Sequence, residues 1–134
     1  MNKYLPLPFL QNGIAQIAIL VEDLEKAMKD YWEKLGIGNW KVYTYKQPLV
    51  KKMSYYVKPG NYSMRLALSN IGPMRIELIQ PLEGDSLYAD FIKTHGYGVH
   101  HLGVLVEDMQ AAIDLAEKAG YQMIMDGAGF GLDG

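Results

Sequence analysis

Hydrophobic positions repeat the same order of patterns in two parts of the chain. Short apolar runs at residues 16–21 and 101–106 are rich in β-branched and aliphatic residues, as buried strands are. Each run is followed by apolar residues at helical spacing, which predicts a helix with one face packed on a sheet. The positions are Leu24, Ala27, Met28 and Tyr31 in the first segment, and Met109, Ala112, Ile113 and Ala116 in the second.

The junctions between these elements are also repeated. Leu-Val-Glu-Asp joins strand to helix at residues 20–23 and 105–108, and Glu-Lys-x-Gly closes both helices at residues 33–36 and 117–120. Chance similarity of two amphipathic segments does not explain a shared junction, so we infer an internal duplication. Asp23 and Asp108 are placed to cap the helices, and the closing glycines to end them.

Three more strands are predicted after the first helix, at residues 39–45, 62–68 and 74–80, with a short extended piece at 53–57. Ser86 is a natural N-cap for a connecting helix. The second unit shows a strand, a helix and a strand around residues 122–125 before a glycine-rich stretch. By analogy with the first unit, about two strands of the second are expected to be missing.

The predicted fold class is therefore α+β, with paired βαβββ modules that form a curved, partly open sheet around a cleft and a second module that is incomplete. We expect one domain over residues 1–134, in three parts. The first module covers about 13–82, the connecting helix about 86–95 and the truncated second module about 98–134.

Composition narrows the possible functions. The chain has 134 residues, a formal net charge of −2 and no cysteine. Nucleic acid and anionic membrane are poor partners, because both require clustered positive charge. Thiolate chemistry is excluded. With no signal peptide and no apolar stretch of about 20 residues, we expect a cytoplasmic protein.

Polar residues inside otherwise apolar strands are the candidates for chemistry, because an unpartnered buried polar group costs about 1–3 kcal/mol. Gln16 and His101 occupy matching positions of the repeat, so an approximate two-fold would point both into one cleft, and Glu77 can face it from a neighbouring strand. Their oxygen and nitrogen atoms suit Zn²⁺, Ni²⁺, Co²⁺, Mn²⁺ or Fe²⁺. His100 is expected on the opposite face of its strand.

The alternative is purely structural. In that interpretation His101 is a core histidine, Gln16 bonds to backbone, and Glu77 pairs with Arg65 or Arg75. Spacing alone leaves both interpretations open.

Two further segments carry a family resemblance, IELIQPL at residues 76–82 and HGYGVHHLG at residues 95–103. With the repeated Val-Glu-Asp junction, they resemble the vicinal-oxygen-chelate (glyoxalase, bleomycin-resistance and dioxygenase) superfamily, and within it the methylmalonyl-CoA epimerases and glyoxalase-like proteins. The resemblance covers about residues 14–126. It implies a divalent metal held by Gln16, Glu77 and His101, and a dimer as the common assembly.

The implied activity is isomerisation by proton transfer next to a metal-chelated carbonyl. The enzyme would be like methylmalonyl-CoA epimerase or lactoylglutathione lyase, and its substrate an acyl-CoA or an α-oxo thiol adduct. The alternative is a non-catalytic small-molecule-binding protein of the bleomycin-resistance kind. Arg65 is a candidate contact for a substrate anion, with a surface salt bridge as its alternative.

The sequence departs from the family pattern at three places. The first ligand position, usually histidine, holds Gln16, as in some glyoxalase I enzymes. The fourth ligand of the family is a glutamate on the last strand of the second module, which this chain does not contain. Met64 and Arg65 lie near the position of the epimerase base, so no catalytic residue is assigned.

Overall fold

Three α-helices and two β-sheets make up the described part of the chain, residues 6–47 and 52–128 of a computed structural model. A short 3-10 helix precedes them. The elements are η1 (Pro8–Asn12), β1 (Gln16–Leu20), α1 (Leu24–Leu35), β2 (Lys41–Tyr45), β3 (Lys52–Tyr55), β4 (Lys58–Pro59), β5 (Met64–Ile71), β6 (Met74–Pro81), α2 (Leu87–His95), β7 (Gly98–Gly103), α3 (Met109–Lys118) and β8 (Gly127–Ala128).

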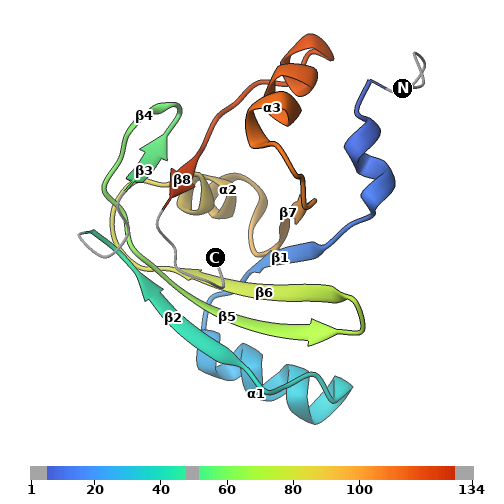
Figure 1. Cartoon of the computed structure of the whole chain (residues 1–134). Coiled ribbons are helices and arrows are strands. Elements are labelled where there is room, and N and C mark those ends of the chain that lie inside the picture. The colour runs from blue at the N-terminus through green and yellow to red at the C-terminus, as the bar shows by residue number, and fades with distance from the viewer. Residues whose placement is uncertain (1–5, 48–51, 129–134) are drawn as a thin grey trace.

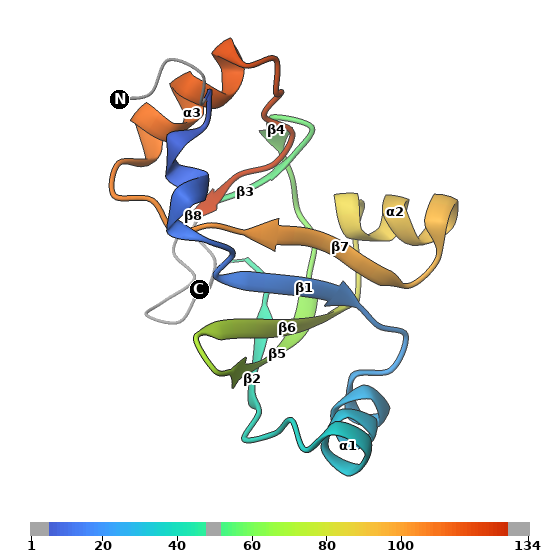
Figure 2. The same cartoon turned by 90° about the vertical axis from the view of Figure 1, so that its right-hand side faces the viewer.

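The larger sheet has five strands in the order β2-β5-β6-β1-β7. It is mixed, because β1 runs parallel to β6 and antiparallel to β7. Helix α1 covers one face, while α2 and the small sheet β4-β3-β8 lie on the other side (Figures 1 and 2). The sheet does not close on itself, since β2 and β7 are its two edges among the described residues. The predicted α+β class with an open sheet is confirmed.

The two faces of the sheet carry separate hydrophobic clusters, because alternate residues of a strand point to opposite sides. On the α1 side, Leu24 packs with Ala67 and Leu78. On the other side, Ala18 packs with Leu66 and Tyr88. The second cluster lies on the face that also carries the predicted functional residues.

All three α-helices begin at the caps expected from the sequence. The side chains of Asp23, Ser86 and Asp108 accept hydrogen bonds from backbone N–H groups three residues later, at 3.1, 3.1 and 3.0 Å. Helix α1 ends at Gly36, whose φ of 70° is left-handed. These bonds satisfy backbone donors that a helix leaves unpaired in its first turn.

The strand predicted around residues 122–125 is wrong, because the structure assigns none there and β8 begins only at Gly127. Local contacts with the β3–β4 hairpin hold the backbone of this segment instead. Val57 N–H donates to the Ile124 carbonyl at 3.3 Å, and Asp126 N–H donates to Ser54 Oγ at 2.7 Å.

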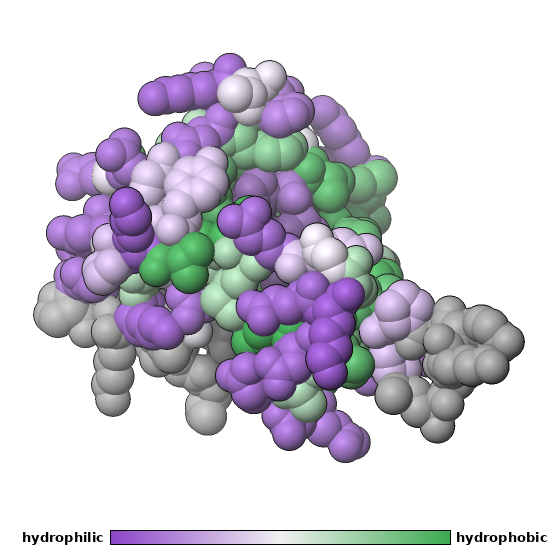
Figure 3. Space-filling view, turned by 90° about the horizontal axis from the view of Figure 1, so that it is seen from above, coloured by the Kyte–Doolittle hydropathy of each residue, from purple (hydrophilic) through white to green (hydrophobic). Residues whose placement is uncertain are grey.

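Helix α3 is the least covered of the three α-helices. It contains no buried residue; its first residue, Met109, is 67% exposed, and Leu105 in the segment before it is 76% exposed. Seen from above, hydrophobic side chains form several exposed patches between hydrophilic ones (Figure 3). Within the two described ranges, none of the helices has the length and apolar character that crossing a bilayer requires.

Candidate functional site

Strand pairing brings the three predicted metal ligands to one face of the sheet. Glu77 on β6 and His101 on β7 both lie directly opposite Ala18 on β1. Residues opposite each other on paired strands share a face, and Gln16 shares it with Ala18 because the two are separated by two positions. The cluster is therefore a product of register, in which three strands contribute one donor each.

The donor atoms of this cluster are close together. Gln16 Nε2 donates a hydrogen bond to Glu77 Oε1 at 3.1 Å, and the same carboxylate oxygen lies 3.9 Å from His101 Nε2. Ala18 lies between them with no exposed surface. Its methyl group leaves room for the longer side chains of Glu77 and His101 to meet above it, although their strands are separated by β1.

The pairing of β1 with β7 is symmetric with respect to the repeat. Gln16 pairs with Gly103, and Ala18 pairs with His101. Since Gly103 is the repeat counterpart of Ala18, an approximate two-fold relates the two strands. Gly103 also gives Gln16 its space, because a Cβ added there would lie 3.0 Å from the Cβ of Gln16.

The expectation that His100 points away from His101 is wrong. The two Nδ1 atoms lie 2.8 Å apart, so one ring donates to the other. The register between β1 and β7 shifts between Ala18 and Ile19, where Ala18 pairs with His101 and Ile19 with Val99. His100 is the extra residue of this β-bulge, which breaks the usual alternation of side chains.

Burial sets the protonation of the cluster. It raises the pKa of Glu77 to about 7, against a smaller lowering by the charge of Arg75. It lowers the pKa of His101 to about 4, with His100 adding to the effect. At neutral pH the His101 ring is therefore uncharged, so its approach to Glu77 is not an ion pair. An uncharged imidazole keeps one nitrogen lone pair available.

Tyrosine rings cover the histidines. Tyr88 of α2 stacks on His101 at 6.5 Å between ring centroids and meets His100 edge-on at 5.1 Å. Burial raises the pKa of Tyr88, and the charge of Glu77 adds to it. Tyr62 packs edge-on against Tyr88 at 6.4 Å, and its buried hydroxyl has no hydrogen-bond partner among the described residues. Burial also raises the pKa of Tyr62, so both phenols stay protonated at neutral pH.

Arg65 is not brought to the cluster. It alternates with Met64 and Leu66 on β5, and its guanidinium lies on the α1 side, 2.7 Å from Glu25 Oε1. The surface salt bridge that the sequence left open as the alternative is therefore present, because an odd step along a strand turns a side chain to the other face. Met64, the other residue expected near the position of the family's base, is buried and has no carboxylate or imidazole to accept a proton.

The spacing of the cluster is near that of ligands around a first-row divalent cation. Metal–ligand distances of about 2.0–2.2 Å put neighbouring ligand atoms roughly 2.8–3.6 Å apart. Glu77 Oε1 and His101 Nε2, at 3.9 Å, lie just beyond this range, and the 3.1 Å contact is a hydrogen bond from the Gln16 amide nitrogen, which is not itself a ligand atom. Among the described residues, no group of three or more His, Cys, Asp or Glu side chains could hold a metal. The cluster has two such residues, and the third donor is the amide of Gln16.

Ala18, His100 and Tyr88 were not among the predicted site residues. In the sequence, Ala18 and Tyr88 have the pattern of ordinary core positions. No local sequence pattern indicates the β-bulge that changes the direction of the His100 side chain. In the structure, Ala18 lies between Glu77 and His101, His100 contacts His101, and Tyr88 packs against both histidine rings.

The open mixed sheet, in which β1 pairs with its repeat counterpart β7 and both strands contribute polar donors, is the arrangement expected from the resemblance to the vicinal-oxygen-chelate class of α+β proteins. Residues 15–134 match the Glyoxalase/Bleomycin resistance protein/Dioxygenase superfamily. The chain belongs to this superfamily, as the sequence resemblance indicates.

Relatives of known name are methylmalonyl-CoA epimerases. The human mitochondrial enzyme is 32% identical over 104 residues, which is 76% of this chain and 51% of the relative. The mouse mitochondrial enzyme is 28% identical over 119 residues, 88% of this chain and 59% of the relative. The chain thus spans between half and three fifths of the length of these relatives.

Solved structures show the same fold. A hypothetical protein of Bacillus halodurans C-125 superposes with a TM-score of 0.60 at 24% identity, covering 84% of this chain and 71% of that one. The Streptomyces coelicolor methylmalonyl-CoA epimerase, in complex with 2-nitronate-propionyl-CoA, gives 0.55 at 25% identity over 79% and 69%. The similarity extends to epimerases that bind acyl-CoA compounds.

Proposed function

We propose that this chain carries the metal-holding cluster of an epimerase of the methylmalonyl-CoA type. Gln16, Glu77 and His101 would hold a divalent cation, and the substrate would be a small acyl thioester. The observation that carries the proposal is the convergence of Gln16 and His101 on one oxygen of Glu77, at 3.1 and 3.9 Å. The similarity to named epimerases supports it.

A bound divalent cation would supply Lewis-acid stabilisation to negative charge that develops on a substrate oxygen. The residues of the chain prepare the site for such a charge. The contact between the Nδ1 atoms of His100 and His101 fixes the orientation of the His101 ring. When His101 donates in this contact, its Nε2 lone pair faces Glu77, which is the form a ligand needs.

Gln16 can present either end of its amide to the cluster. Its Nε2 faces Glu77 in the structure, where it donates to the carboxylate oxygen. Rotation of the amide by half a turn would present its oxygen instead, with little change in the shape of the side chain. Because burial raises the pKa of Glu77 to about 7, its carboxyl is still partly protonated at neutral pH, so a cation would compete with a proton there.

Titration with Co²⁺ tests the ligand set. We expect one equivalent to bind the wild-type chain, and affinity to fall by at least roughly 100-fold in Glu77→Ala and His101→Ala, because loss of even an outer partner costs 10- to 100-fold. Arg65→Ala is the matched control, since its guanidinium lies on the α1 face. Equal Co²⁺ affinity in wild type and both ligand variants would remove the metal site from the proposal.

Proton exchange tests the reaction. In D₂O, methylmalonyl-CoA incubated with the Co²⁺-loaded chain should gain deuterium at its α-carbon faster than with the Glu77→Ala variant. The proton acceptor is not assigned, because neither Met64 nor Arg65 can serve. Tight binding of the thioester without any exchange would indicate a binding protein in place of an enzyme.

A further inference from the structure

Helix α2 holds the ring of His100 through three of its own residues. The ring meets Tyr88 edge-on at 5.1 Å and Phe91 edge-on at 5.0 Å, measured between ring centroids. It also forms a hydrogen bond with the backbone of Leu87, the first residue of the helix. The helix therefore places both ring nitrogens of His100, and one of them is the nitrogen that contacts His101.

The hydrogen bond with Leu87 runs from the ring to the backbone. Burial lowers the pKa of His100, and this bond raises it in part. A bond that raises the pKa of an imidazole favours a ring N–H, so the ring donates and the Leu87 carbonyl accepts. Because Nδ1 of His100 already contacts His101, the nitrogen that donates to Leu87 is Nε2.

The proton on Nε2 of His100 determines where His101 carries its own proton. A neutral imidazole has one N–H and one lone pair, so His100 has only a lone pair at Nδ1. The contact of 2.8 Å between the two Nδ1 atoms then needs His101 as its donor. With its proton on Nδ1, His101 directs the lone pair of Nε2 toward Glu77 Oε1, 3.9 Å away. The reverse arrangement would set the lone pair of His100 Nε2 against the Leu87 carbonyl oxygen.

We propose that His100 is a positioning residue that keeps His101 in the tautomer with its proton on Nδ1, through the bond that His100 donates to helix α2. The value of this tautomer for a cation rests on the proposed function, because a metal ligand needs the Nε2 lone pair. Without His100, the His101 ring could also adopt the other tautomer, in which Nε2 carries the proton and cannot act as a ligand. The tautomer is a property of the metal-free protein as well.

Nuclear magnetic resonance measures the tautomers directly. The metal-free chain is labelled with ¹⁵N-histidine, and long-range ¹H–¹⁵N spectra are recorded at neutral pH with a chelator. The chain has three histidines, so spectra of His95→Gln and His100→Phe assign the signals by difference. We expect the proton of His101 on Nδ1 and that of His100 on Nε2. A wild-type His101 ring with its proton on Nε2 overturns the inference without any need for a variant.

Two substitutions at position 100 separate the acceptor from the ring. His100→Phe keeps an aromatic ring between Tyr88 and Phe91 but removes the acceptor, whereas His100→Asn supplies an amide oxygen near the position of Nδ1. We expect His100→Phe to give a mixture of His101 tautomers and to weaken Co²⁺ binding by roughly tenfold, as loss of an outer partner does. His100→Asn should restore the Nδ1 tautomer and most of the affinity. An unchanged His101 tautomer in His100→Phe would overturn the positioning role.

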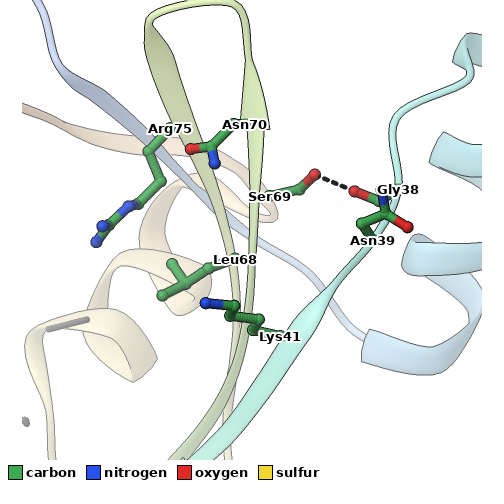
Figure 4. Close-up of a pocket in the computed structure, with 7 residues that line it drawn as sticks. All are labelled: Gly38, Asn39, Lys41, Leu68, Ser69, Asn70 and Arg75. Carbon is green, nitrogen blue, oxygen red and sulfur yellow. Dashed lines mark hydrogen bonds between the residues drawn. The ribbon is translucent and has the colours of Figure 1, made fainter. Parts of the chain in front are cut away.

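The variant Ser69→Ala is the matched control for the loss of a hydrogen bond to a backbone carbonyl. Ser69 on β5 turns toward Gly38 and donates to its carbonyl (Figure 4). This bond lies on the α1 side of the sheet, because Ser69 follows Leu68, which packs on the side of the donor cluster. Ser69→Ala should lose stability in urea and keep the wild-type tautomer and Co²⁺ affinity. A change of tautomer as large as that in His100→Phe would show that general loosening moves the proton, and it would reject the role of His100.

The two measurements distinguish this inference from the proposed function. The expected tautomers without Co²⁺ binding by the wild type would support the role of His100 and reject the metal cluster. Co²⁺ binding by the wild type, with the same tautomer and affinity in His100→Phe, would support the cluster and reject the role of His100. Urea unfolding verifies that the variants are folded. If His100→Phe does not fold, the wild-type spectrum and His100→Asn decide the inference.

Discussion

Glu77 is a buried carboxyl whose protonation depends on the fold. Its pKa is raised to about 7 from an ordinary 4.5, chiefly by burial. In the metal-free protein, the folded state therefore keeps a proton that the unfolded state releases at lower pH. The stability that this proton contributes is complete below pH 4.5 and is lost as the pH rises through 7.

The variant Glu77→Gln removes that titration. With a chelator present, we expect the free energy of unfolding of the variant, relative to wild type, to increase by roughly 2 kcal/mol between pH 5 and pH 8. Urea unfolding at the two pH values measures it. The titration of His101 has the opposite effect, because its pKa is lowered from 6.5 to about 4 and the folded state therefore loses stability as the pH falls through this range. His101 is present in both proteins, so its contribution cancels in the comparison. Parallel stability profiles for the two proteins would contradict the raised pKa.

The sequence predicts the donors better than their surroundings. Gln16, Glu77 and His101 could be grouped because the repeat relates two of them and strand alternation aligns the third. The same alternation could have placed Arg65 with Ala67 on the α1 face, since Met64 and Leu66 are the apolar partners of the other face. The contact of His100 with His101 depends on cross-strand register, which no local pattern encodes.

At the scale of elements, the two repeated helices begin alike and pack differently. Asp23 and Asp108 make the same capping bond, but α1 is anchored by the buried Leu24 while α3 contains no buried residue. Capping was predictable because it is local chemistry. The strand expected at residues 122–125 was not, because a strand also needs a neighbour in the right place, and here that neighbour is the β3–β4 hairpin.

The two caps should therefore differ in their effect on stability. Asp23→Ala is expected to lower the global free energy of unfolding by about 1 kcal/mol, the usual cost of a lost N-cap. Asp108→Ala should leave the global value within about 0.3 kcal/mol and speed amide hydrogen exchange at residues 109–112, because α3 can fray locally. Denaturation and hydrogen exchange on both variants measure this. An equal loss of global stability would show that α3 is as firmly held as α1.

Over the whole molecule, the open sheet, the helix on one face and the repeat were all predictable from hydrophobic periodicity and the duplicated junction. The small sheet was not, since β3 and β8 are short and far apart in sequence. Ser54 and Asp126 join them. The Ser54 hydroxyl bonds to the backbone carbonyl and N–H of Asp126 at 3.0 and 2.7 Å, and Lys52 pairs with the Asp126 carboxylate.

A pair of substitutions separates these two links. Ser54→Ala should cost about 1–3 kcal/mol and open residues 121–128 to proteases, because it leaves backbone groups without their partner at a buried position. Asp126→Asn removes only a partly exposed ion pair and should cost less than about 1 kcal/mol. Denaturation and limited proteolysis compare the two. Faster cleavage in Asp126→Asn than in Ser54→Ala would mean that charge, rather than the hydroxyl, holds this segment.

The methyl group of Ala18 lies between Glu77 of the first repeat and His101 of the second, in one row across three strands. The hydrogen-bonded pairing of these strands fixes the distance over which the two flanking side chains must reach each other. Under the proposed function, a larger side chain at position 18 would enter the space where the Glu77 and His101 side chains meet. It would thereby change the cation size that the proposed cluster prefers without altering any of its proposed ligands.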